Sequence, residues 1–454
     1  MSKVEVNQIS SQCGSTLTIG QSGDTVTLAA GATQTGFGRT GTVDWDTTAK
    51  TASFTAVSGN GYFVNTTSGA ITVTLPATPS AGDIVSIADY TNTFQTNNVT
   101  VAPNGSPIGG VTENATLSTE GQSVTFIYVD GTEGWKNVQD STSNVTGAVF
   151  ITATGGTITT CGDYKIHTFT SPGTFCVSQL ATNPTNNNVD YLVVAGGAAG
   201  GHNNGGFNAG GGGGAGGMRF SATTYCSPSP LKAPAGLPVT ATGFPITVGG
   251  GGAGASIGCA QGNSGSNSVF STITSTGGGG GGTGCTSGFE PGASGGSGGG
   301  GLGRAPASAP GGAGNTPPVS PSQGSSGGTG GAHPKRQGGG GGGFTATGTS
   351  STPDGSIPGN GGAGLGISIT GSCVARAGGG GGAAGPQCSN GTAGTGGIGG
   401  GGAGANNNQP IGGGNGVDAT SGTTNTGGGG GGSNAGGSAG SGGSGIVIIR
   451  YRFQ

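Results

Sequence analysis

Few side chains in this 454-residue sequence carry strong chemistry, because Asp, Glu, Lys and Arg together make up only 6% of it. Residues 191–454 hold three carboxylates, Glu290, Asp354 and Asp418, which stand far apart in the sequence. A general acid and base need paired groups in reach of one substrate, and no recognisable pair is present. We therefore predict no catalytic residues and no enzyme activity. A depolymerase would need a carboxylate cluster that forms only in space.

The histidines and cysteines lack the spacing of a metal site. His167, His202 and His333 have no acidic or cysteine neighbours at ligand spacing, so each is expected to be structural or exposed. A dinucleotide-binding fingerprint needs a G-x-G-x-x-G string that follows a strand and opens a helix. None of the G-x-G-x-x-G strings in this sequence does both, which excludes such a fingerprint. No metal and no cofactor is predicted. The cysteines, which form no C-x-x-C pair, are Cys13, Cys161, Cys176, Cys226, Cys259, Cys285, Cys373 and Cys388.

The redox state of the cysteines follows from the expected compartment. The N-terminus has no apolar signal-peptide core, so we expect synthesis in a reducing cytoplasm and mostly free, buried thiols. Cys161 and Cys176 flank a predicted hairpin and are the favoured pair if a disulfide forms. No run of about 20 apolar residues occurs, so no membrane insertion is expected.

Binding chemistry is concentrated in a few residues that separate runs of glycine. Aromatic rings can stack on sugars, and cationic side chains can bond carboxylate or phosphate. The two adjacent charges Lys335 and Arg336 are too few for a nucleic-acid-binding patch. The alternative to a binding role for them is an ordinary solvated loop. We predict no nucleic-acid partner. The candidate receptor-binding residues are Tyr225, Arg304, His333, Lys335 and Arg336.

These candidates lie in a glycine-dominated stretch, residues 196–445. Of the 115 glycines in the chain, 93 follow residue 190, in runs such as 277–282 and 338–343. Collagen is excluded because it needs glycine at every third residue. A disordered linker remains an alternative. We predict a bundle of polyglycine helices with three residues per turn, whose backbone groups must bond laterally because such helices have no internal hydrogen bonds.

Two apolar runs bracket this stretch. Residues 191–195 and 446–449 are apolar without alternation, which indicates strands buried on both faces. We predict that residues 147–195 and 446–454 form a β-sandwich scaffold, with further strands near 244–248 and 267–274. The glycine bundle is then an insertion pinned at both ends.

The N-terminal part of the chain follows the period of strands. In residues 45–146, the segment 71–75 alternates apolar and polar side chains, and turn signals such as Asn104-Gly105 separate several further short apolar segments, which indicates an antiparallel β-sandwich or meander. Residues 1–44 are expected to be an extended β leader for attachment. The predicted fold class is therefore all-β plus a polyglycine bundle, with essentially no α-helix.

The order of the N-terminal segments resembles a module of bacteriophage tail fibres, notably those of phages of aquatic bacteria. The segments that carry this resemblance are 62–76 (YFVNTTSGAITVTLP), 82–85 (GDIV), 98–105 (NVTVAPNG), 124–129 (VTFIYV) and Gly134-Trp135. The resemblance implies a β domain in an elongated, trimeric virion appendage. It also implies docking to other tail or baseplate proteins through the N-terminus.

The C-terminal part is similar to phage tail-fibre tip adhesins. The matching segments are 193–197 (VVAGG), 246–252 (ITVGGGG), 266–271 (SNSVFS) and 442–451 (GGSGIVIIRY). A comparable glycine-rich fold occurs in the extracellular region of anaplastic lymphoma kinase. The resemblance implies a virion protein whose tip loops bind a bacterial surface glycan or outer-membrane protein. The alternative is a purely structural virion decoration or a self-assembling extracellular filament.

Overall fold

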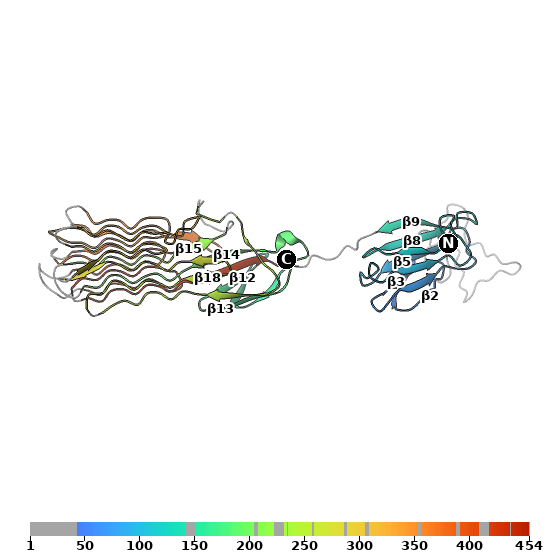
Figure 1. The fold of residues 1–454 in the computed structure, drawn as a ribbon, viewed down its shortest axis with the longest axis horizontal. Coiled ribbons are helices and arrows are strands. Elements are labelled where there is room, and N and C mark those ends of the chain that lie inside the picture. Colours follow the sequence, from blue (N-terminus) through green and yellow to red (C-terminus); the bar gives the residue numbers. More distant parts are fainter. Residues whose placement is uncertain are drawn as a thin grey trace, which may run out of the picture. The chain divides into compact units, whose positions relative to one another are not determined.

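The chain divides into two compact units, Met1–Gly147 and Ala148–Gln454 (Figure 1). The computed structural model describes residues 43–141, 150–203, 208–221, 231–233, 235–256, 258–285, 288–304, 308–352, 356–386, 391–407, 417–435 and 437–453. The predicted leader, residues 1–44, lies almost entirely outside these ranges. Within them the one helical element is a three-residue 3-10 helix, Pro184–Asn186. The prediction of an all-β chain is confirmed.

The first unit consists of two β-sheets around one apolar core. Side chains from both sheets, including Val64, Val73 and Trp135, meet in this core and are buried. One sheet has the order β1 (Asp44–Lys50), β3 (Asn60–Val64), β5 (Ile84–Asp89), β8 (Ser123–Tyr128) and β9 (Trp135–Ser141). The other has the order β2 (Phe54–Thr55), β4 (Ile71–Thr74), β6 (Val99–Ala102) and β7 (Ala115–Leu117).

The predicted antiparallel arrangement of residues 45–146 is wrong for part of this unit. From β1 to β6, successive strands alternate between the two sheets, so the chain returns to each sheet in the same direction. The pairs β1–β3, β3–β5, β2–β4 and β4–β6 are therefore parallel. Only the later pairs, β5–β8, β8–β9 and β6–β7, are antiparallel. Two parallel strands need a crossover connection between them. In this unit each such crossover contains a strand of the opposite sheet.

The second unit begins with the predicted β-sandwich scaffold, and its named strand pairs are antiparallel. One sheet has the order β10 (Thr152–Thr154), β13 (Gly173–Gln179), β17 (Gly243–Thr247), β18 (Ser268–Phe270) and β19 (Ile273–Ser275). The other has the order β11 (Thr157–Cys161), β12 (Tyr164–Phe169), β24 (Ile446–Arg452), β14 (Asn188–Val194) and β15 (Met218–Phe220). A short strand, β16 (Leu237–Pro238), pairs with β14. Two small hairpins lie outside the sheets, β20 (Thr283–Cys285) with β21 (Gly288–Glu290) and β22 (Leu365–Ile367) with β23 (Val374–Arg376).

The two apolar runs that bracket the glycine stretch are neighbours in space. β14 and β24 pair antiparallel, with Val194 opposite Ile446. Alternate residues of each strand face different cores: Val193 and Val447 lie between the two sheets, whereas Leu192 and Ile448 lie on the other face of their sheet. The prediction of strands buried on both faces is confirmed, and the chain leaves and re-enters the scaffold at adjacent points.

The glycine runs are joined sideways by hydrogen bonds that repeat every third residue. In the central run 210–217, each backbone N–H donates to another segment, and the acceptor changes at every residue. The acceptors come in turn from residues 427–433, 276–282 and 339–342. The N···O distances are 2.7 to 3.0 Å, from Gly210 to Ser433, Gly211 to Gly282, Gly212 to Gly339, Gly213 to Gly430, Gly214 to Gly279, Ala215 to Gly342, Gly216 to Gly427 and Gly217 to Thr276. This is the pattern expected of a three-residue helix without internal hydrogen bonds.

The carbonyl oxygens of the same run meet a second set of neighbours. They accept from N–H groups in residues 195–201, 297–300 and 380–383, at 2.7 to 3.1 Å. The run is therefore surrounded by three acceptor segments and three donor segments. Every N–H of the run and seven of its eight carbonyl oxygens thus have a backbone partner without regular strands, as buried peptide groups require.

Side chains are excluded from these contacts. A Cβ atom built on Gly213 would lie less than 3.0 Å from the carbonyl oxygen of Ala198, and one built on Gly211 would lie equally close to that of Gly300. Real Cβ atoms essentially never come so close to backbone. Glycine is needed at these positions for close approach of the backbones, rather than for an unusual backbone conformation.

Replacing Gly213 by Ala is expected to lower the free energy of unfolding by at least about 2 kcal/mol, because the new methyl group overpacks the centre of the bundle. Gly250 is the matched control, since a Cβ there meets nothing within 4 Å. Gly250→Ala should leave stability unchanged or raise it by about 0.5 kcal/mol. Thermal or urea unfolding of the two variants measures the difference. Equal stability of both variants would contradict the tight packing.

Candidate functional site

The glycine runs connect the strands to a set of turns at the opposite end of the second unit, which we call the tip. Run 195–201 leaves β14 and run 210–217 returns to β15, so residues 202–203 and 208–209, at the far ends of these runs, lie away from the strands (Figure 1). The turns that follow Gly303, Gly331 and Ala384 lie at the same end, as the hydrogen bonds below establish.

Four of the five predicted binding residues lie together at the tip. Gly303 bonds with Ala209, which places Arg304 beside the first tip turn, and the Arg304 N–H donates to the carbonyl oxygen of Gly331 at 2.9 Å. The next turn carries His333, Lys335 and Arg336 and is closed by bonds from Arg336 to Ala332 and from Gly331 to Gln337. His333 is exposed, whereas Arg304, Lys335 and Arg336 are half-buried.

The fifth candidate, Tyr225, lies outside the described residues. The segment that follows it belongs to the strand end, where the Ala233 N–H donates to the Phe220 carbonyl oxygen at 2.8 Å. A shallow hollow lies here, lined by Tyr191, Met218, Arg219, Phe220, Leu231, Ala233 and Pro321. The sequence alone could not tell this segment from those of the tip. The segments between successive glycine runs lie alternately at the strand end and at the tip.

Sequence reasoning missed a layer of buried polar side chains that fixes the tip turns. The Asn203 amide oxygen accepts from the Gly284 N–H at 3.1 Å, and the Gln337 amide oxygen accepts from the Gly385 N–H at 2.7 Å. The Asn434 amide nitrogen donates to the carbonyl oxygens of Ala384 and Asn406 at 3.1 and 3.2 Å. Each of these side-chain amides forms hydrogen bonds with backbone groups at the end of a glycine run that the contacts between runs do not satisfy. A polar residue directly at the end of a glycine run was the available signal.

Of the three carboxylates in residues 191–454, two lie within the described ranges, in separate segments. Glu290 ends β21 and is exposed, the Asp418 carboxylate accepts from the Ser438 N–H at 2.7 Å, and Asp354 lies outside the described residues. Within the described ranges, no three His, Cys, Asp or Glu side chains come together as metal ligands. No helix in the same ranges is long and apolar enough to span a bilayer.

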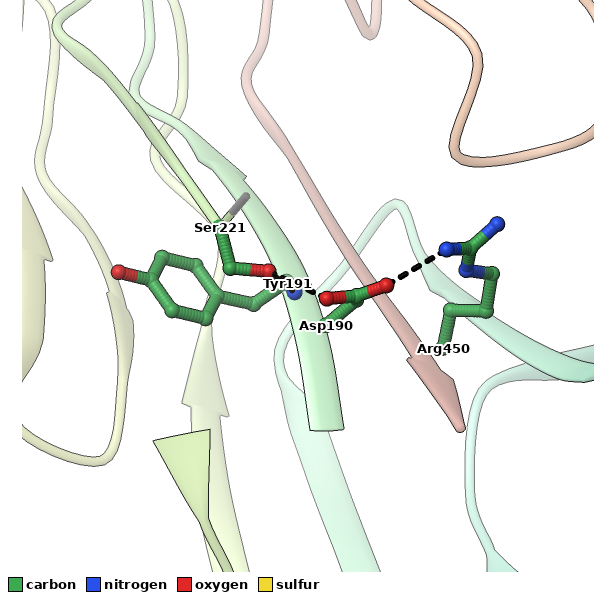
Figure 2. A network of polar contacts seen from close by, with 4 residues as sticks. All are labelled: Asp190, Tyr191, Ser221 and Arg450. Atoms are coloured by element: carbon green, nitrogen blue, oxygen red, sulfur yellow. Dashed lines mark hydrogen bonds and ion pairs between the residues drawn. The ribbon is translucent and has the colours of Figure 1, made fainter. Parts of the chain in front are cut away.

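One polar network resembles part of a hydrolase site but is structural. The Ser221 hydroxyl donates to the Asp190 carboxylate at 2.9 Å and accepts from the Tyr191 N–H at 3.0 Å (Figure 2). The second Asp190 oxygen bonds the Arg450 guanidinium at 2.6 Å. Asp190 and Arg450 stand opposite each other across β14 and β24. The network therefore ties the two bracketing strands to the segment after β15, with no histidine in it to activate the serine.

The expected state of the cysteines is corrected by the structure. Cys161 and Cys176 are free and exposed, rather than bonded or buried. Cys161 ends β11 in one sheet and Cys176 lies in β13 of the other, so the hairpin expected between them does not exist. Cys259 and Cys373 are each part of a disulfide, so the expectation of free thiols is wrong at these two positions.

Comparison with protein families agrees with this architecture. A family model described as a glycine-rich domain matches residues 170–452. The chain belongs to this glycine-rich domain family. The matched range of the glycine-rich domain begins directly after β12 and ends with β24, so it includes the bracketing strands, the glycine runs and the tip. No curated protein matches the chain.

One further titratable group of the second unit, His167 in β12, is fully buried in the scaffold. Its Nδ1 donates to the Gly155 carbonyl oxygen at 2.7 Å, so its Nε2 accepts from the Tyr451 hydroxyl at 3.2 Å. The ring therefore packs as the neutral form, and burial lowers its pKa.

The lowered pKa of His167 predicts acid sensitivity. Unfolded chains bind a proton at this histidine near pH 6.5, whereas the folded protein binds it only at lower pH, so the free energy of unfolding should fall as pH drops below about 6.5. Urea unfolding between pH 4 and 7 measures this slope. His167→Gln should reduce it, and the exposed control His333→Gln should not. An unchanged slope in His167→Gln would contradict the assignment.

Proposed function

We propose that this protein is a bacteriophage tail-fibre or tip adhesin, a homotrimer at least in its N-terminal part. In this proposal the N-terminus docks to tail or baseplate proteins, the β unit is a spacer, and the glycine-rich domain presents the tip to a bacterial surface glycan or outer-membrane protein. The protein acts in the virion, without membrane insertion or a nucleic-acid partner. The resemblance of the segment order in residues 62–135 to tail-fibre modules supports the virion assignment.

The observation that carries the binding role is the grouping of Arg304, His333, Lys335 and Arg336 on adjacent tip turns. The runs below these turns are held by lateral hydrogen bonds, so the cationic groups stand on a rigid base. Loops on a rigid scaffold are the usual place for recognition residues. Guanidinium and ammonium groups there would bond carboxylate, phosphate or carbonyl oxygens of a surface ligand.

The backbone of Arg336 supports the same reading. Its φ angle is 52°, in the left-handed region, where a non-glycine residue costs about 1–2 kcal/mol. Glycine would remove this cost, and the chain uses glycine freely, with 115 in total. An arginine at this strained position is understandable if its side chain is used.

The test is binding of the purified chain to a panel of bacteria. The triple variant Arg304→Ala, Lys335→Ala, Arg336→Gly should bind at least about tenfold more weakly than the wild type, because it loses charge-assisted hydrogen bonds. A matched control removes three cationic groups from the strands, in Lys165→Ala, Arg219→Ala, Arg452→Ala, and should bind as the wild type does. Pre-incubation with wild-type protein should block infection of the bound strain.

Two outcomes would contradict the proposal. Equal binding by the tip variant and the wild type would exclude the tip as the binding site. Failure of the wild type to bind any strain, together with assembly into filaments or lattices in electron micrographs, would favour the purely structural role.

A further inference from the structure

The first unit carries a strip of three aromatic rings, two exposed and one half-buried, on the outer face of its larger sheet. Trp45 in β1 is 39% exposed and Tyr90, directly after β5, is 55% exposed. Phe63 in β3 lies between them, with ring centroids 4.9 Å from Trp45 and 6.3 Å from Tyr90. We call these three residues the aromatic strip.

Small residues of the sheet lie beneath the strip, whose ring planes are inclined by 31° between Trp45 and Phe63 and by 65° between Phe63 and Tyr90. Trp45 pairs with Gly61, and a Cβ on Gly61 would lie 2.7 Å from the indole ring. Phe63 pairs with Ala88 on the adjacent strand β5, where the side chain is also small. Because Tyr62 and Val64 face the core, Phe63 points to the opposite face of β3. Small residues under large rings produce a shallow apolar surface.

The loop that holds Tyr90 is rigid. The buried Asp89 carboxylate accepts backbone N–H groups from Thr93, Phe94 and Gly121, each at 3.1 Å. The Tyr90 N–H donates to the Val64 carbonyl oxygen at 3.0 Å. A carboxylate with several backbone donors fixes the loop and so presents the Tyr90 ring in one place.

Polar groups border the strip at its Tyr90 end. The Asn65 amide oxygen accepts from the hydroxyls of Thr67 and Thr91 at 2.6 and 3.2 Å, and all of these contacts are exposed. The Thr91 hydroxyl is 2.9 Å from that of Thr93. Lys50 and Asp46, both in β1, form an ion pair at 2.7 Å. The surface combines stacking faces with uncharged hydroxyl and amide groups.

We propose that the aromatic strip is a second binding site, which takes uncharged oligosaccharides by stacking of sugar rings on Trp45, Phe63 and Tyr90. Sugars present apolar C–H faces and equatorial hydroxyls, and the strip with its polar border offers both complements. A second copy of the chain fits less well, because a stable protein interface needs about 800 Å² per partner with an apolar centre. The strip is a single row bordered by threonine and asparagine.

The two tryptophans provide a direct readout. Trp45 is partly exposed whereas Trp135 is fully buried, so quenching of tryptophan fluorescence by acrylamide reports mainly on Trp45. The full chain is titrated with cellohexaose, maltohexaose, chitohexaose and hexasaccharides of mannose and galactose. At least one of these should protect Trp45 from quenching and saturate.

Variants identify the strip as the site. Tyr90→Ala should weaken that sugar's binding about tenfold, whereas Tyr90→Phe keeps the stacking ring and should bind within about threefold of the wild type. Val138→Ala removes another exposed apolar side chain, 56% exposed in β9, and should change nothing. Unfolding curves check that Tyr90→Ala folds.

Two results would overturn the proposal. One is no protection of Trp45 by any hexasaccharide of the panel, or equal protection in Tyr90→Ala. The other is protection that rises with protein concentration in the absence of sugar, which would make the strip a contact between copies of the chain. Neither result depends on the tip. The sugar test can therefore fail while the test of binding by the tip succeeds, and the reverse.

Discussion

The structure of the second unit depends on hydrogen bonds between backbones that have no side chains to separate them. A glycine run in a three-residue helix has no bonds of its own, so every N–H and C=O must find a partner in a neighbouring run. In run 210–217 every N–H and seven of the eight carbonyl oxygens have such a partner, and the partner segment changes at each residue. The same requirement excludes side chains, as the clash of a Cβ on Gly213 with the Ala198 carbonyl oxygen illustrates. The glycine-rich composition of the runs is therefore a requirement of their close packing.

Ordering so much glycine is costly, since each residue loses about 1–2 kcal/mol of conformational entropy and glycine loses the most. The scaffold reduces this cost by fixing both ends of the insertion. β14 and β24 are adjacent, are buried on both faces, and are joined by the Asp190–Arg450 pair. At the tip, buried amides such as Asn203, Gln337 and Asn434 close the turns. The arrangement leaves a rigid platform on which a few cationic side chains can act.

Much of this organisation could be predicted from the sequence, and the failures have physical causes. Unbroken apolarity in residues 191–195 and 446–449 indicated strands buried on both faces, which the pairing of β14 with β24 bears out. Alternation in residues 71–75, which include β4, indicated a half-buried strand, but a period of two does not say which strands are its neighbours, so its parallel pairing with β2 and β6 was missed. The spacing of Cys161 and Cys176 suggested a hairpin, but the two residues lie in different sheets.

The sequence named candidate binding residues but did not show which of them lie together. Arg304 and His333 stand out by their chemistry alone. Whether two such segments lie at the same end of the bundle depends on how many glycine runs separate them in the sequence. The polar residues that fix the turns were missed because Asn203 and Gln337 differ little from other polar spacers until their backbone partners are known. The aromatic strip joins Trp45, Phe63 and Tyr90 from three places in the chain, and only the parallel order of β1, β3 and β5 brings them into one row.

The central claim is that the glycine runs are held by lateral hydrogen bonds. Amide hydrogen exchange tests it most directly, because run 210–217 has neither helix nor strand and would exchange within seconds as a linker. The account predicts that the amides of Gly211 to Gly216 are protected as strongly as those of β14 and β24 and exchange only on global unfolding. Exchange of these amides at the rate of an unstructured chain, while the strands stay protected, would contradict it.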